Sequence, residues 1–222
     1  MRVDEGVIKF EAKHEHRALA PSRYASLARE LAQFRERLIA VGAIGQAPER
    51  YGGAGFGNVS ARLGRRDAPA GRRAMLITGT QTGGRPALNL DDFCVVSRYD
   101  VASNRVESRG LVLPSSEAMT HGAIYDLSST IRWVLHGHCP TLWRHARALG
   151  IPCTARDVAY GTPAMAREMR RLYESTPLAA LGVLAMDGHE DGVIAFGSDG
   201  DDTVQAVVDF VALAAQHVVQ PH

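Results

Sequence analysis

The amino-acid sequence predicts a single α/β domain in which a mostly antiparallel central β-sheet is flanked by helices. Its 222 residues match the length of one such domain or of two small ones, and 45% of them are hydrophobic, enough for a sizeable core. Segments with helical spacing of apolar residues alternate with short apolar runs typical of strands. Several neighbouring strands are joined by connections too short for parallel crossovers, which favours antiparallel pairing.

The chain is expected to begin with an N-terminal arm over residues 1–21, which are mixed in character, and to continue as one domain over residues 22–222. Ser22 is expected to cap the first helix, and Gly42 to end it. Apolar residues recur there at steps of three and four, the period of one helix face. The predicted buried positions of this helix are Leu27, Leu31, Phe34, Leu38 and Val41.

Further elements follow from local signals along the chain. Apolar runs predict strands at residues 59–63, 75–77, 93–96, 131–136, 182–186 and 193–196, and residues 106–112 are expected to pair near the third of these. Helices are predicted where a capping residue or a proline precedes a helical pattern. Their expected starts are Ser115 or Ser116, Pro140, Thr162-Pro163 and Asp201-Asp202.

Charge and composition exclude several classes of protein. Lys and Arg number 25 and Asp and Glu number 24, a formal charge of +1, which argues against a broad basic face for nucleic acid or a polybasic membrane anchor. The first six residues lack the apolar run of a signal peptide, and no stretch approaches the roughly 20 apolar residues of a bilayer span. Three cysteines without paired spacing give no disulfide framework. We therefore expect a cytoplasmic protein with no nucleic-acid or membrane partner.

A His-x-His motif, His136-Gly137-His138, ends an apolar strand. Side chains two residues apart on a strand point to the same face, so both imidazoles can bind one metal ion. With nine histidines in the chain, chance alone gives roughly 0.4 such pairs, so two half-exposed histidines are the alternative interpretation. Cys139 faces the opposite side from His138 and is expected to pack in the core.

His189 lies in a predicted turn between two apolar strands. A third nitrogen ligand there would complete a site with three protein ligands and one open position, the arrangement of catalytic zinc. Alternatively, His189 is an ordinary turn residue. The neighbouring carboxylates of Asp187, Glu190 and Asp191 are either acceptors for metal-bound imidazoles or solvated turn residues.

Three polar segments suit the binding of an anion. Pro114-Ser115-Ser116-Glu117 precedes a helical run, where free backbone N–H groups and hydroxyls favour an oxyanion. Glu117 itself is either a general acid/base or a charge that opposes the helix dipole. Residues 57–60 and 78–84 are glycine-rich and carry short polar side chains, which is also typical of oxyanion loops.

Taken in order, these motifs resemble the class II aldolase/adducin family, which includes fuculose-phosphate and rhamnulose-phosphate aldolases. The resemblance covers about residues 24–218 and implies the fold of that family. It rests on residues 57–62, 76–83, 114–117, 136–138 and 160–162 and on His189. One departure is that Glu190 and Asp191 separate His189 from Gly192, whereas in the family a glycine follows the third histidine directly.

The resemblance also implies a cofactor, site residues and an assembly. A Zn²⁺ or another divalent ion would be held by His136, His138 and His189, and Glu117 would match the catalytic acid/base. The family usually forms a homotetramer with its active sites at subunit boundaries. The choice between Thr80 and Thr82 stays open because the loop is longer than usual. The residues that match the family's phosphate-binding positions are Gly57, Asn58, Thr82, Gly83, Ser115 and Ser116.

The function indicated is a zinc-dependent, aldolase-like lyase that acts on a small sugar or sugar phosphate through a metal-stabilised enediolate. Three alternatives are weighed. A sugar-phosphate epimerase of the same family would resemble the chain with Asp in place of Glu117. A dehydratase would carry its glutamate after the His-x-His motif, and no such motif is found between Arg144 and Tyr160. A non-catalytic, adducin-like interaction module would not need all three histidines, and all three are present.

Overall fold

The computed structural model describes residues 6–219. The start of the expected arm (1–5) and the end of the expected domain (220–222) lie outside the described residues. Two sets of strands are found there. A short hairpin pairs β2 (Gly45–Gln46) with β3 (Gly55–Phe56). The main sheet is built from β1 (Glu11–His16), β4 (Asn58–Arg62), β5 (Met75–Thr78), β6 (Phe93–Asp100), β7 (Arg105–Gly110), β8 (Trp133–His138), β9 (Val183–Ala185) and β10 (Gly192–Gly197).

The main sheet has the order β1-β7-β6-β5-β4-β8-β10-β9 within the described residues. Every neighbouring pair is antiparallel except β1 and β7, which run parallel. Strand β8 therefore lies in the interior of the sheet, between β4 and β10. The predicted α/β fold with a mostly antiparallel central sheet is confirmed.

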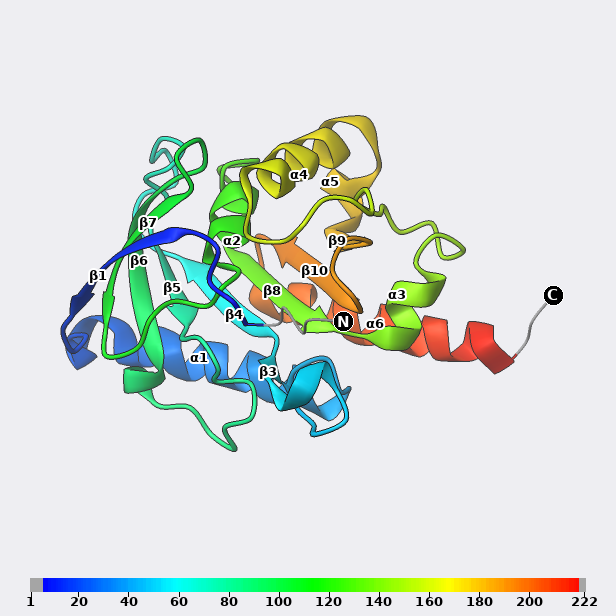
Figure 1. The fold of residues 1–222 in the computed structure, drawn as a ribbon, viewed down its shortest axis with the longest axis horizontal. Helices are drawn as coiled ribbons and strands as arrows, with labels where there is room; N and C mark the ends of the chain where they lie inside the picture. Colours follow the sequence, from blue (N-terminus) through cyan, green and yellow to red (C-terminus); the bar gives the residue numbers. More distant parts are fainter. Residues whose placement is uncertain (1–5, 220–222) are drawn as a thin grey trace.

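Helices cover both faces of the sheet, as Figure 1 shows. One face packs against α1 (Pro21–Ala40), α3 (Pro140–His145) and α6 (Gly200–Val219), and the other against α2 (Ala118–Tyr125), α4 (Pro163–Ser175) and α5 (Leu178–Leu181). Two single turns of 3₁₀ helix lie at Tyr51–Gly53 and Leu90–Asp92. Strand alternation divides the apolar residues between two cores. Leu135 of β8 points to the α1 side, whereas Val134 points to the α2 side.

The first helix shows how local signals place the chain near β8. Leu31, Phe34 and Leu38 of α1 are buried, as predicted. The prediction for Ser22 was wrong: Pro21 is the first helical residue and Ala20 the N-cap, because proline needs no N–H partner at that position. Gly42, at a φ of 71°, ends the helix, and the N–H of Ala43 donates to the Leu38 carbonyl.

Two other elements differ from expectation. Neither Ser115 nor Ser116 caps α2: the N-cap is Glu117, and Ser115 instead accepts a hydrogen bond from the Glu117 N–H through its Oγ. The expected arm contributes β1 to the sheet edge. Most β1 side chains are exposed, so this strand carries no apolar alternation that the sequence could reveal. Its pairing with β7 combines backbone hydrogen bonds with polar side-chain contacts, among them His14 with Ser108 and Arg105 with Glu11.

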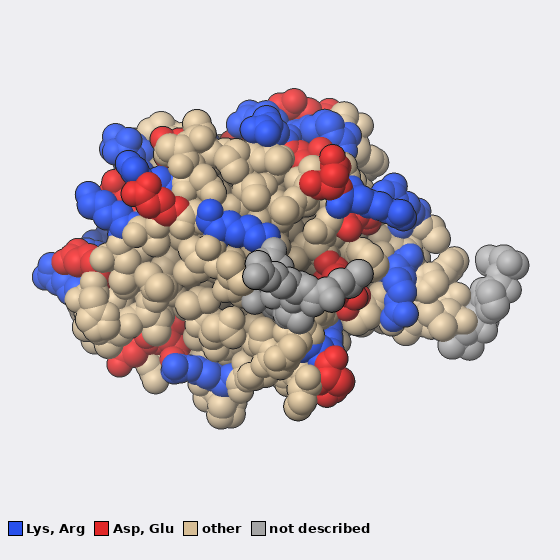
Figure 2. Space-filling model, in the orientation of Figure 1, with Lys and Arg blue, Asp and Glu red and all other residues tan. Residues whose placement is uncertain are grey.

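The described part of the chain has no helix that is both long and apolar enough to cross a bilayer. On the face drawn in Figure 2, basic and acidic side chains are interspersed and do not gather by sign. This distribution agrees with the near-zero net charge of the sequence. It gives no support on that face for a broad electrostatic surface of the kind that binds nucleic acid.

Candidate active site

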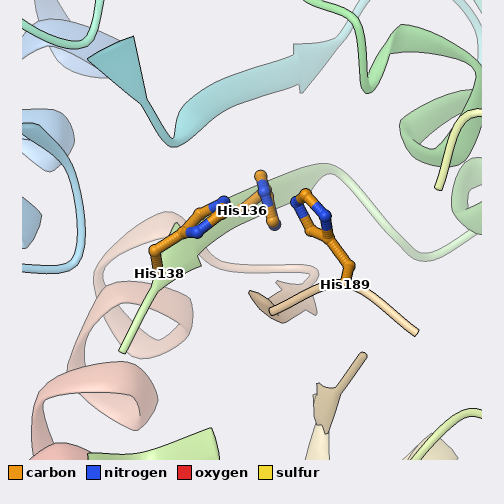
Figure 3. Close-up of side chains that lie close together, drawn as sticks. All are labelled: His136, His138 and His189. Atoms are coloured by element: carbon orange, nitrogen blue, oxygen red, sulfur yellow. The ribbon is translucent and has the colours of Figure 1, made fainter. Parts of the chain in front are cut away.

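Three imidazoles converge on the side of the sheet covered by α2 and α4 (Figure 3). His136 and His138 come from β8, and His189 comes from the turn between β9 and β10. One ring nitrogen from each residue lies within 4.8 Å of the others. All three side chains are buried. The structure thus brings together the three histidines that the sequence singled out, including one that lies more than fifty residues further along the chain.

The backbone around β8 explains this convergence. His136 and His138 share a face because they are two residues apart on a strand. Gly137 between them is required by close packing: a β-carbon there would lie 2.8 Å from the Ala43 carbonyl oxygen. The His138 N–H donates to that same oxygen at 2.7 Å. The end of α1 therefore fixes the end of β8.

The third histidine is placed by a tight turn. The His189 N–H donates to the Met186 carbonyl, and the Gly192 N–H donates to the His189 carbonyl, both at 2.9 Å. Asp191 has a φ of 62°, the left-handed region that aspartate tolerates better than most residues. Cys139, next in sequence to His138, packs in the core on the opposite side, as predicted.

Burial keeps the imidazoles neutral at ordinary pH. It lowers the pKa of His136 to about 4. Burial and then the charge of neighbouring His136 hold the pKa of His138 and His189 well below the usual range, and the Lys9 ammonium lowers that of His189 further. Neutral imidazole is the form that binds metal ions.

The donor set fits a divalent metal ion. His136 Nδ1 lies 3.1 Å from the Val193 carbonyl oxygen and donates to it in the neutral tautomer that leaves Nε2 as an acceptor. That buried Nε2 has no hydrogen-bond partner among the described residues. A backbone acceptor behind a metal-binding imidazole is a common arrangement, since it fixes the tautomer and the ring orientation. Three neutral nitrogens around one point match a zinc-type site.

Glu117 lies beside this cluster. One carboxylate oxygen, Oε1, is 3.8 Å from His189 Nε2, and the side chain is only 2% exposed. Its position as N-cap of α2 places the carboxylate at the positive end of the helix dipole. The arrangement gives a buried carboxylate within reach of anything bound at the three imidazoles.

The glycine-rich segments lie at neighbouring strand ends next to the histidines. Asn58, the first residue of β4, is buried and is the register partner of His136. Gly57 has a φ of 80°, and a β-carbon there would lie 2.5 Å from Ile44 Cγ1. Gly83 packs against the backbone of Phe56, just before Gly57. Four of the predicted phosphate-binding residues thus lie in one region: Gly57, Asn58, Thr82 and Gly83.

The serines join the same region. The Ser115 N–H donates to the Thr78 carbonyl at 3.2 Å, and Gly79 forms a bridge with Pro114. Ser115 and Ser116 are both buried. The Thr82 hydroxyl donates to the Gly79 carbonyl at 2.9 Å, so it helps to shape its own loop. Of the two threonines left open by the sequence, Thr82 is buried and Thr80 is half-buried.

Arg35 of α1 holds this loop in place. Its guanidinium Nη2 donates to the carbonyls of Thr82, Gly83 and Arg85 at 3.1, 2.9 and 2.6 Å. The Arg35 side chain is 2% exposed, so an interior cation satisfies these three carbonyls. No local sequence signal points to Arg35, because its partners lie about fifty residues away.

Replacing Arg35 with methionine should lower the free energy of unfolding by about 2–4 kcal/mol, because three carbonyls lose a charged donor. Urea denaturation measures the change. Arg37→Met is the matched control on the same helix: Arg37 makes an exposed ion pair with Asp201, so its loss should cost less than about 1 kcal/mol. Equal, small effects of the two substitutions would contradict the role of Arg35.

Comparison with known proteins agrees with this geometry. Residues 47–218 match the model of the class II aldolase and adducin N-terminal domain. This chain belongs to that family. No curated protein matches the sequence. Among solved structures, an L-fuculose 1-phosphate aldolase is similar with a TM-score of 0.60 at 18% identity, over 89% of this chain and 90% of that chain.

Two further structures show the same class II aldolase fold. The L-fuculose-1-phosphate aldolase of Thermus thermophilus has a TM-score of 0.59 at 18% identity, over 88% of this chain and 93% of that one. A sugar-phosphate aldolase of Thermotoga maritima has a TM-score of 0.62 at 16% identity, over 89% and 97%. At such identities the likeness establishes the fold of the family.

The structure of this class II aldolase family member adds residues that the sequence did not reveal. Tyr51 donates its hydroxyl to Asp191 at 2.6 Å, and its ring lies 4.6 Å from that of His138. Arg50 donates to the Tyr51 hydroxyl and to the His138 carbonyl. Burial, and then the bond to Asp191, raise the pKa of Tyr51 well above its usual range. Asp191, one of the two residues that separate His189 from Gly192, therefore ties the turn to the end of β8.

A second buried group joins β4 to α2. Ser60 Oγ lies 2.7 Å from His121 Nδ1 and 2.8 Å from the Tyr125 hydroxyl. His121 is one helical turn beyond Glu117 on α2, and burial holds its pKa well below the usual range. Tyr160, which the sequence placed in a family motif without a role, packs its ring 4.5 Å from that of His189.

Proposed function

We propose that this protein is a metal-dependent aldehyde-lyase of the aldolase type that acts on a small sugar or sugar phosphate. The observation that carries the proposal is the group of three buried imidazoles with the Glu117 carboxylate 3.8 Å from His189. Family membership supports it, as do the names of the three similar structures described above, which are sugar-phosphate aldolases.

In this proposal His136, His138 and His189 would hold Zn²⁺ or another divalent ion, which when bound supplies a positive charge that polarises a substrate carbonyl. Glu117 acts as the acid/base. In cleavage, the hydroxyl on the leaving carbon gives up its proton to water and becomes the aldehyde C=O as the carbon–carbon bond breaks. The electron pair of that bond stays on the other carbon, to which Glu117, in its protonated form, delivers a proton. In synthesis, Glu117 removes that proton.

The end of the substrate away from the metal would be held where the glycine-rich segments and the two serines meet, which we call the anion-binding region. The proposed contacts are backbone N–H groups and hydroxyls, which stabilise an oxyanion without an added charge. Burial of Asn58, Thr82, Ser115 and Ser116 supports a preorganised region, because such side chains do not need to reorder on binding. The residues assigned this role are Gly57, Asn58, Thr82, Gly83, Ser115 and Ser116.

A substrate screen tests the proposed reaction. Phosphorylated and unphosphorylated ketoses are incubated with metal-loaded protein, and aldehyde release is measured; dihydroxyacetone phosphate with a set of aldehydes tests the reverse direction. We expect carbon–carbon bond cleavage that stops when a chelator removes the metal. An epimerised or dehydrated product without cleavage would contradict the lyase assignment and point to one of the other reactions of the family.

We also propose a homotetramer, an assembly with closed symmetry that suits active sites at subunit boundaries. Light scattering at micromolar concentration should give a mass about four times the 24.0 kDa of one chain. In this proposal each active site is completed by a neighbouring subunit. Dilution that dissociates the tetramer should therefore lower the measured mass of the assembly and its activity together. A monomeric mass with full activity would contradict this proposal.

A further inference from the structure

The segment just before β1 runs along the candidate site. The Tyr160 hydroxyl donates to the Val7 carbonyl at 3.2 Å, and the Asn104 side-chain amide donates to the Lys9 carbonyl at 2.8 Å. At Gly6, an added β-carbon would lie 2.1 Å from Nε2 of Gln81, so this glycine packs against the tip of the loop at residues 79–84. Residues 6–9 therefore connect the anion-binding region with Tyr160.

This segment brings a cation to the histidines. The Lys9 ammonium lies 3.7 Å from the centre of the Tyr160 ring, and the same ring is 4.5 Å from that of His189. Gly161, next to Tyr160, lies between this segment and the start of α2. A β-carbon at Gly161 would be 3.1 Å from the Ser116 carbonyl oxygen and 3.8 Å from Lys9 Cβ. Lys9 and the Ser115-Ser116-Glu117 turn therefore both pack against Gly161.

We propose that Lys9 is a substrate-binding residue that contacts an anionic group of the substrate, either a phosphate or a carboxylate. The inference rests on the proposed function, because it assumes that the substrate binds at the three histidines. A half-buried ammonium in contact with an aromatic ring is poorly hydrated, and a charge-assisted hydrogen bond to an anion is stronger there than in water. The family match begins at residue 47, so Lys9 is a contribution of this chain from outside the matched part.

Ligands that share a metal-binding group and differ only in the charge of the opposite end test the role of Lys9 separately from the metal centre. The probes are three hydroxamic acids with the same metal-binding end: acetohydroxamic acid, whose far end is an uncharged methyl group, and two relatives with an anionic far end, phosphonoacetohydroxamic acid and succinic acid monohydroxamic acid. Calorimetry measures their binding to zinc-loaded wild type and to Lys9→Met, Lys9→Arg and Lys13→Met. Lys13 lies on the exposed side of β1 and serves as the matched control. Metal content and melting temperature of each variant confirm that it is folded and loaded.

We expect Lys9→Met to weaken binding of at least one anionic probe by about tenfold or more, as for a lost charged hydrogen bond, and to leave acetohydroxamate unchanged. Lys9→Arg should retain most of the affinity, and Lys13→Met all of it. The anionic probe that responds identifies phosphate or carboxylate. Unchanged binding of both anionic probes to Lys9→Met would overturn the inference and leave Lys9 as a packing partner of Tyr160. Absence of bound zinc from the wild type would overturn the metal centre itself, and the inference with it.

Discussion

Glu117→Gln should lower turnover by about 10²-fold or more and leave the metal content unchanged. The glutamine has the shape of glutamate but cannot give or take a proton at neutral pH, and losing a positioned acid/base typically costs that much. Three histidine nitrogens suffice to hold the ion. Turnover and metal content are measured on the same preparation, with a substrate identified by the screen.

The matched control for this substitution is Glu174→Gln, since Glu174 is exposed near the end of α4. It should change neither quantity. If Glu117 serves only as a charge at the start of α2, its replacement should cost about 0.3–1 kcal/mol of stability and leave turnover intact. Full activity with full metal content would therefore place Glu117 among the structural residues and remove the main reason for an aldolase mechanism.

Replacing a single histidine of the triad should have an even larger effect on activity. His136→Ala or His189→Ala should weaken metal binding by about 100-fold or more, because even the loss of an outer hydrogen-bond partner costs about 10–100-fold and a direct ligand contributes more. Turnover should then become undetectable at metal concentrations that saturate the wild type. Competition with a chromogenic chelator gives the dissociation constants.

His16→Ala controls for the general effect of removing a histidine, because His16 is exposed on β1. Metal affinity of this variant should equal that of the wild type. Melting temperatures measured without metal separate loss of a ligand from loss of the fold. Retention of tight metal binding by both His136→Ala and His189→Ala would show that the ion binds elsewhere.

The parts of the site that lie on regular elements could be predicted from the sequence. His136 and His138 share a face because strand alternation requires it, and the apolar run before them identifies the strand. The helix starts at Pro140 and Pro163 also follow from local chemistry, since proline suits the first helical position. Physical reasoning from residues alone left His189 as either a ligand or a turn residue. Its meeting with β8 depends on the long-range pairing of β10 with β8.

The parts that could not be predicted depend on contacts between distant segments. Arg35 bonds to carbonyls about fifty residues away, and Tyr51 to Asp191 across 140 residues. Neither has a local signature, because the partners lie far along the chain and nothing near Arg35 or Tyr51 in the sequence indicates them. Strand β1 is polar and mostly exposed, so its place at the sheet edge follows from backbone pairing with β7 and from polar contacts such as that of His14 with Ser108. The segment just before this strand brings Lys9 to Tyr160, and no local signal in the sequence indicates this contact.

The most direct test of the central claim is the position of the metal. A crystal of the zinc-loaded protein, measured with X-rays on both sides of the zinc absorption edge, gives an anomalous map that shows zinc alone. We expect one peak per chain, about 2.0–2.1 Å from a ring nitrogen of each of His136, His138 and His189. A fully loaded crystal in which the peak lies away from these three residues, or in which His189 does not reach it, would contradict the claim that they form the metal centre.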